Sequence, residues 1–177
     1  MGGAQKTEQR LAVILPLSLL LIGLLVYSAV HNWLDTVLVL LDIPVACTGG
    51  VLALLITGTP LSISAVMGFV SVFGLAVQDA LLLVTYFQDL HLRQGFSVEH
   101  AAREAAEKRF RPVLMTTMVA TLGLLPAALS NGIGAQTQKP LAIVVIGGTL
   151  TLAILTRILQ PPLRVLAYRW LDKTSGA

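Results

Sequence analysis

Apolar residues occur in this chain as long uninterrupted blocks, not as the alternating pattern of a half-buried strand. A helix needs about 20 predominantly apolar residues to cross the hydrocarbon core of a bilayer. Five blocks have about this length: residues 11–30, 34–56, 64–87, 113–130 and 141–163. The pattern therefore predicts an all-α fold, an integral membrane helical bundle of five transmembrane helices. We assign residues 11–170 to the bundle, with a short segment before it (residues 1–10) and a tail after it (residues 171–177).

The most charged stretch of the chain lies between the third and fourth blocks. Within this stretch Ser97 is a candidate N-cap, and Val98, Ala101, Ala102 and Ala105 recur at helical spacing on one weakly apolar side. These features predict a short amphipathic helix over residues 97–108, lying along the membrane surface. An ordinary solvated connector explains the same pattern equally well.

Composition supports a membrane protein and excludes several other classes. Hydrophobic residues make up 55% of the chain and charged residues 12%, whereas soluble domains average about 25% charged residues. The net charge of +3 comes from dispersed basic residues, so we predict no nucleic-acid partner. The single Cys47 allows no disulfide within the chain, and the three histidines have no metal-ligand spacing. We therefore assign no metal site and no cofactor.

The distribution of lysine and arginine predicts the orientation. With five spans, residues 88–111 and the C-terminal tail share one side of the membrane. That side has five basic residues in the connection and three in residues 164–177, whereas the other side has three in all. By the positive-inside rule the C-terminus is cytoplasmic and the N-terminal segment is external, in a multi-pass membrane protein. This orientation suits the end of a longer chain better than a free-standing five-span protein.

The third block carries polar residues where a membrane helix rarely tolerates them. Asp79 and Gln78 lie well inside it, and an ionisable group at that depth costs at least ~2.5–3.5 kcal/mol on insertion scales. Asp79 is either a carboxylate that binds and releases a proton or a carboxyl group hydrogen-bonded to a neighbouring helix for packing. Asp42 is a secondary candidate in the second block. On the third block Ser64, Gly68, Ser71, Gly74 and Gln78 also form a small, polar stripe that predicts close helix packing.

Three runs of the sequence resemble one transporter family. They are LAVILPLSLLLIGLLVYSA, IPVACTGGVLALLITGTPLSISAVMGFVSVFGLAV and EKRFRPVLMTTMVATLGLLPAALSNGIGAQTQKPLAIVVIGG, within which RFRPVLMTT and GxGAQTQKPLAxVVxGG are the most specific parts. The chain resembles the resistance-nodulation-division (RND) efflux pumps, specifically the heavy-metal cation efflux branch of AcrB/AcrD/AcrF type. The resemblance extends from about residue 9 to residue 170 and implies the last five spans of a twelve-span, trimeric, proton-exchanging pump.

The resemblance also implies candidate residues for proton coupling. It aligns Gln78 with a lysine of multidrug members and Asp79 with the neighbouring asparagine, and it aligns Arg109 and Thr116 with an arginine and a threonine that support the relay. Seven residues separate Arg109 from Thr116, which places them on one face if the helix continues through Pro112. Our proton-relay candidates are therefore Asp79, Gln78, Arg109 and Thr116.

Two functions of different classes are compatible with these observations. The chain is either the C-terminal transmembrane part of a proton-driven heavy-metal efflux transporter, not competent without the missing N-terminal half, or a non-transporting remnant or small partner that packs against full-length pumps. An intramembrane enzyme is disfavoured, because the sequence contains no nucleophile–base pair or metal constellation. Met67, Met115 and Met118 are soft metal ligands by chemistry, but scattered methionines are typical packing residues.

Overall fold

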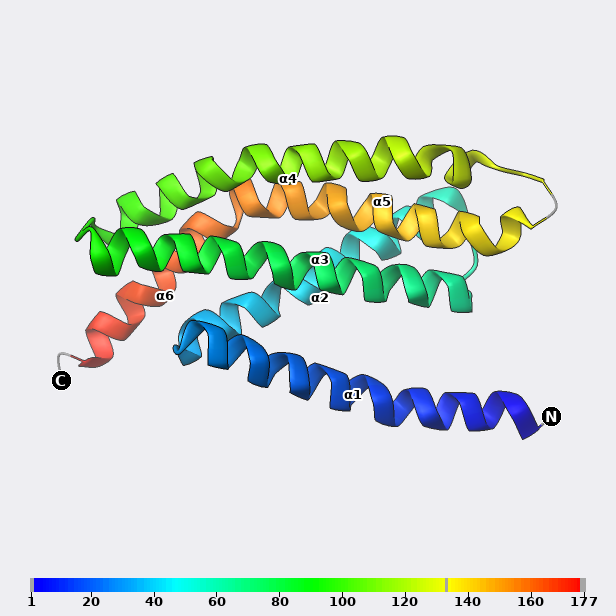
Figure 1. Cartoon of the computed structure of the whole chain (residues 1–177), viewed down its shortest axis with the longest axis horizontal. Coiled ribbons are helices and arrows are strands. Elements are labelled where there is room, and N and C mark those ends of the chain that lie inside the picture. The colour runs from blue at the N-terminus through cyan, green and yellow to red at the C-terminus, as the bar shows by residue number, and fades with distance from the viewer. Residues whose placement is uncertain (1, 133, 176–177) are drawn as a thin grey trace.

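The computed structural model is a bundle of helices (Figure 1). It describes residues 2–132 and 134–175, and the side chains of these except 2–9, 11, 15, 155, 156 and 171–175. In chain order the described elements are α1 (Gly2–Val30), α2 (Trp33–Thr57), α3 (Ile63–Gln88), a π-helical turn (Asp89–Arg93), α4 (Val98–Leu129), α5 (Ala135–Ile158) and α6 (Gln160–Ser175). Helices α1 to α5 each contain a stretch long and apolar enough to cross a membrane, which confirms the predicted all-α membrane bundle.

Helix α5 packs against α2, α3 and α4, and the main apolar core lies around it. Glycines bring α2 and α5 together, because a Cβ atom added to Gly49 would lie 2.6 Å from the backbone oxygen of Gly147. Gly68 of α3 meets the same helix, where an added Cβ would be 3.0 Å from the Cβ of Val144. The missing side chains of these glycines thus permit the close packing of the helices.

The short connections are closed by the residues that such turns require. Asn32 caps α2 by accepting a hydrogen bond from the Leu34 amide, and Ser62 caps α3 by accepting one from Ala65. Gly58 ends α2 in the left-handed region (φ 62°), where a residue without a Cβ has no steric cost. Helices α2 and α3 are thereby held as an antiparallel pair.

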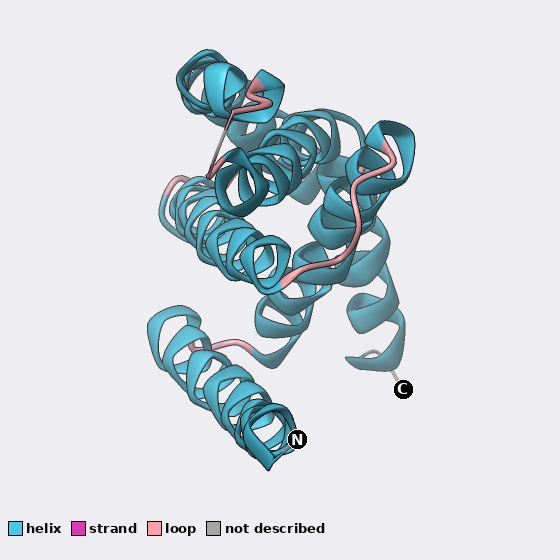
Figure 2. Ribbon diagram, turned by 90° about the vertical axis from the view of Figure 1, so that its right-hand side faces the viewer, coloured by secondary structure: helices cyan, strands magenta, loops and turns pink. Residues whose placement is uncertain are grey.

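Helix α1 lies beside the rest of the bundle. In Figure 2 it is separated from the other helices along most of its length. Its last turns make the contact, where Val26 and Val30 are buried against Val39, Ala80 and Val84. Most of the described leucines upstream are exposed, as expected for a helix that contacts lipid along its length.

Two boundaries differ from the sequence interpretation. The predicted amphipathic helix and the fourth span form one continuous helix, α4, which runs through Pro112. The proline has no backbone N–H, so the helix lacks one hydrogen bond at this point. One turn further along, the Thr116 hydroxyl donates to the Pro112 carbonyl at 3.0 Å. The fifth block instead divides into α5 and α6 at Leu159, just before Pro161 and Pro162.

The small-residue stripe on α3 is divided between two environments. Gly68 is buried against α5, whereas Ser71, Gly74 and Gln78 are exposed, and nothing lies within 4 Å of a Cβ added to Gly74. Gly123 on α4 is open in the same way. The residues that α3 buries are instead an alanine and valine row that includes Ala65, Val72, Ala76, Ala80 and Val84.

Candidate functional site

The central feature of the site is an ion pair between α3 and α4. The Arg109 Nη2 atom donates to Asp79 Oδ1 at 2.8 Å, and each side chain is only 20% exposed. The pair stands within the apolar stretch of α3, where water cannot screen it well. The structure thus brings together two of the four residues that the sequence and the resemblance singled out, from positions thirty residues apart.

A small cavity of about 80 Å³ adjoins this pair. All four predicted relay residues line it, together with five others: Leu75, Val113, Thr117, Thr149 and Leu152. Because α4 continues through Pro112, Arg109 and Thr116 reach the cavity from the same helix, two turns apart. The volume and the polar lining are sufficient for a few water molecules.

The sequence reasoning missed two threonines on the cavity wall. Thr117 is buried and donates to the backbone oxygen of Thr149 at 3.3 Å, which ties α4 to α5. The Thr149 hydroxyl in turn donates to the Val145 carbonyl at 2.8 Å. The signal available in the sequence was weak, because a threonine in an apolar helix usually satisfies its hydroxyl on its own backbone.

Asp42, the secondary candidate, is buried but belongs to a different cluster. Its carboxylate accepts a hydrogen bond from the Gln160 side chain of α6. The Gln160 oxygen accepts from Arg164 Nε at 3.3 Å. Asp42 therefore faces α6, and it is not one of the residues that line the cavity beside Asp79.

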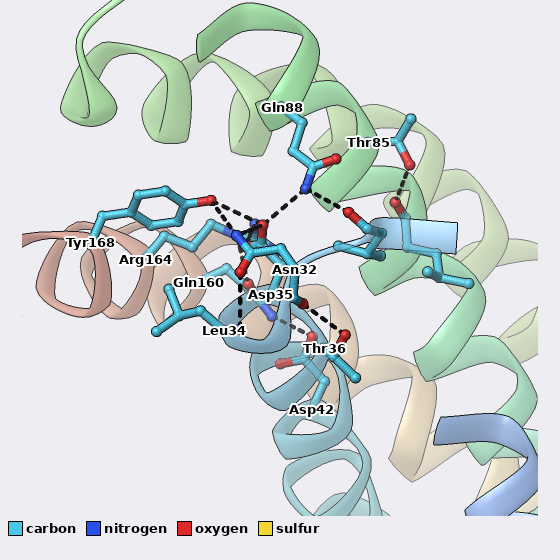
Figure 3. Close-up of polar contacts among 12 residues, drawn as sticks. Asn32, Leu34, Asp35, Thr36, Asp42, Thr85, Gln88, Gln160, Arg164 and Tyr168 are labelled. Atoms are coloured by element: carbon cyan, nitrogen blue, oxygen red, sulfur yellow. Dashed lines mark hydrogen bonds and ion pairs between the residues drawn. The ribbon is translucent and has the colours of Figure 1, made fainter. Parts of the chain in front are cut away.

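This second cluster is a buried polar network that joins the end of α1, α2, α3 and α6 (Figure 3). Its centre is Asp35, which has no exposed surface and lies 3.4 Å from Arg164 Nη1, itself 1% exposed. Asp35 also accepts hydrogen bonds from Tyr168 (2.9 Å), Gln88 (3.0 Å) and Asn32 (3.2 Å). Burial, together with the neighbouring Asp35 carboxylate, raises the pKa of Tyr168 above its ordinary value, so this phenol stays protonated and donates.

The sequence interpretation did not identify this network. Arg164 and Tyr168 both lie beyond the predicted fifth span, and the sequence alone could not show that they fold back onto Asp35. A usable signal was nevertheless present, because Gln160, Arg164 and Tyr168 are spaced four residues apart and share one face of a helix.

The described residues offer no constellation for metal chemistry. They contain no group of three or more His, Cys, Asp and Glu side chains that could hold an ion. Met67, Met115 and Met118 are all exposed and lie on the outer surface of α3 and α4. What the central site does contain is a carboxylate, a guanidinium and hydroxyl groups around a small cavity, a set suited to moving or holding a proton.

The sequence model of the AcrB/AcrD/AcrF family matches residues 2–168 of the chain. The chain belongs to this family. One similar protein is the cobalt-zinc-cadmium resistance protein CzcA of Cupriavidus metallidurans, which is 44% identical over 93% of the chain. The nickel and cobalt resistance protein CnrA of the same organism is 45% identical over 90% of it. The RND heavy-metal efflux resemblance inferred from the sequence is thereby confirmed.

Comparison with solved structures also supports the fold. The crystal structure of a heavy metal efflux pump matches 93% of the chain with a TM-score of 0.74 and 38% identity. The chain spans about 15% of the length of CzcA and CnrA, and about 16% of that pump. Most of the length of these relatives therefore has no counterpart in the chain.

Proposed function

We propose that this chain is the C-terminal transmembrane part of a proton-driven RND-type efflux transporter for heavy-metal cations. It is a transporter component rather than an enzyme, and it requires the N-terminal half of a pump to work. The observation that carries the proposal is the Asp79–Arg109 pair beside a small polar cavity. The names of the relatives CzcA and CnrA favour metal cations as the substrate class.

The chemistry of the pair explains how a proton would change the site. While Asp79 is ionised, the Arg109 guanidinium is attracted to it at 2.8 Å across a poorly screened space. A proton bound to Asp79 removes that attraction and leaves the partly buried Arg109 guanidinium without its counter-charge. Arg109 then moves toward water or toward another acidic group, and this displacement couples proton binding to a shift of α4 against α3.

Gln78 and Thr116 would contribute at the edge of the same site. Gln78 is exposed beside Asp79, and an amide can accept or donate a hydrogen bond but provides no charge. Thr116 is exposed on the opposite wall. Both are therefore available to side chains of another helix that packs on this face.

The N-terminal half of the pump would pack on the exposed small residues of α3 and α4. Ser71, Gly74 and Gly123 are exposed, and such residues let another helix approach closely. Alternating access in these transporters involves two repeats that move against each other, and a five-span part cannot provide this alone. We place the assembly in the bacterial inner membrane as a trimer, with the C-terminus cytoplasmic.

The experiment is a metal-tolerance assay in an efflux-deficient bacterium. The chain is expressed alone and together with the N-terminal half of a related pump, and growth is measured over increasing cobalt, zinc and cadmium. We expect tolerance only with both parts. Asp79→Asn should abolish it, because the amide cannot release a proton at physiological pH.

The matched control is Asp89→Asn, which neutralises a carboxylate ten residues further along that is 40% exposed and pairs with Arg93. It should retain tolerance, and immunoblots of inner membranes should show equal amounts of all variants. If the co-expressed parts give no tolerance although both are present in the membrane, the transporter proposal fails. The chain would then be the non-transporting remnant or partner.

A further inference from the structure

A groove of about 590 Å³ lies between the start of α4 and α6, away from the Asp79 site. One side is polar and is formed by Ser97, Glu99, His100 and Arg103 at the beginning of α4. The other side is formed by α6 and is largely apolar, with Pro161, Pro162, Val165 and Leu166, and it ends at Arg169. A cationic rim and an apolar floor thus meet in one groove.

The rim favours an anion. The Arg103 side chain is exposed and makes no ion pair or hydrogen bond within the described part of the chain. Arg169 donates from Nη2 to Glu99, which holds the guanidinium at the groove but leaves its other nitrogens available. Ser97 caps the N-terminus of α4 here, so the positive end of a 32-residue helix adds to the two arginines. Glu99 is the opposing charge.

The floor is continuous with the lipid-facing surface of the bundle. Along α5 the outward residues Leu150, Ile154 and Ile158 are 46%, 60% and 66% exposed, and on α6 Leu166 and Trp170 are 68% and 66% exposed. Helix α6 turns its polar side inward, where Arg164 and its neighbours join the buried network (Figure 3). Its apolar residues Leu166 and Trp170 are on the exposed side. An outward apolar side beside a membrane span is a surface for acyl chains.

We propose that this groove binds an anionic phospholipid. Arg103 and Arg169 hold the headgroup phosphate, and His100 lies beside it. One acyl chain lies along Pro162, Val165 and Leu166. Basic pockets between membrane helices on the cytoplasmic side recognise anionic headgroups in this way. A free phosphate ion would use the rim but not the apolar floor, and the lipid is therefore the occupant that fits the whole groove.

Quenching of Trp170 fluorescence by brominated lipids tests the proposal, because this residue lies next to Arg169 on the exposed side of α6. The full chain, with Trp33→Phe to leave one tryptophan, is reconstituted in phosphatidylcholine vesicles. Brominated phosphatidylglycerol or brominated phosphatidylcholine is added in increasing fractions. We expect phosphatidylglycerol to occupy the site with a preference of roughly five-fold or more over phosphatidylcholine. Each basic residue near the membrane surface raises the binding constant for an anionic lipid by about that factor.

The double variant R103A/R169A should reduce this preference to about one. The control R93A/R111A removes two exposed arginines outside the groove and should keep it, while far-UV circular dichroism verifies equal helix content. If both double variants lose the lipid preference equally, the arginines attract anionic lipid only through the general surface charge, and the proposal is overturned. Absence of a preference in the unsubstituted chain would overturn it as well. Full competition by inorganic phosphate would assign the rim to a free anion instead of a lipid.

Discussion

Removal of Arg164 tests how α6 is held to the bundle. Arg164→Ala leaves the Asp35 carboxylate buried without its cation, a change that typically costs 3–5 kcal/mol. The pair is long at 3.4 Å, and Tyr168, Gln88 and Asn32 still donate to the carboxylate. We therefore expect the lower end of that range, about 3 kcal/mol, or roughly two powers of ten in the unfolding equilibrium constant.

The assay is equilibrium unfolding of the chain in mixed micelles of dodecyl maltoside and increasing sodium dodecyl sulfate. Trp33 provides the fluorescence signal, since it lies two residues from Asp35 and its ring centroid is 5.1 Å from that of Tyr27. The matched control is Arg169→Ala on the same helix, whose side chain is 71% exposed and should contribute little to stability.

A double variant separates charge from packing. Asp35→Asn combined with Arg164→Met removes both charges and keeps similar volumes, so its stability should return to within about 1 kcal/mol of the original. If Arg164→Ala unfolds at the same detergent fraction as the unsubstituted chain, the pair does not hold α6. If the double variant is as unstable as the single one, lost packing of Arg164 over the Phe87 ring is responsible rather than the unpaired charge.

Two further predictions concern packing and orientation. Gly147→Ala should destabilise the bundle by about 1–3 kcal/mol in the same unfolding assay, because the added Cβ would lie 2.6 Å from a backbone oxygen of α2. The control Gly123→Ala should be neutral or slightly stabilising, because nothing lies within 4 Å of its added Cβ. Equal effects would contradict the glycine contact. In a Cys47→Ala background, Gln94→Cys should react with a membrane-impermeant maleimide only after the cytoplasmic face is opened, and Pro60→Cys should react in intact spheroplasts. Labelling of both from one side would refute the orientation.

Much of the candidate site was accessible from the sequence. The resemblance and the depth of Asp79 in an apolar helix selected Asp79, Gln78, Arg109 and Thr116, and all four line one cavity. These residues lie close together because a carboxylate in a membrane helix needs a partner, which limits the possible neighbours. Their role in proton transfer stays a prediction. Thr117 and Thr149 were missed because their hydroxyls bond to backbone, a contact that leaves no pattern in the sequence.

The sequence by itself determined the five apolar helices and the family. Helix formation in a membrane is dictated locally, because each backbone group must find its partner within the segment. The tertiary structure alone decided that α4 continues through Pro112 and that Arg164 and Tyr168 of α6 return to Asp35 near the start of α2. The positions of Asp35 and Arg164 differ by 129 residues, and no local preference links them. Only the packing of α6 against the bundle brings these charges together, and burial then makes their pairing obligatory.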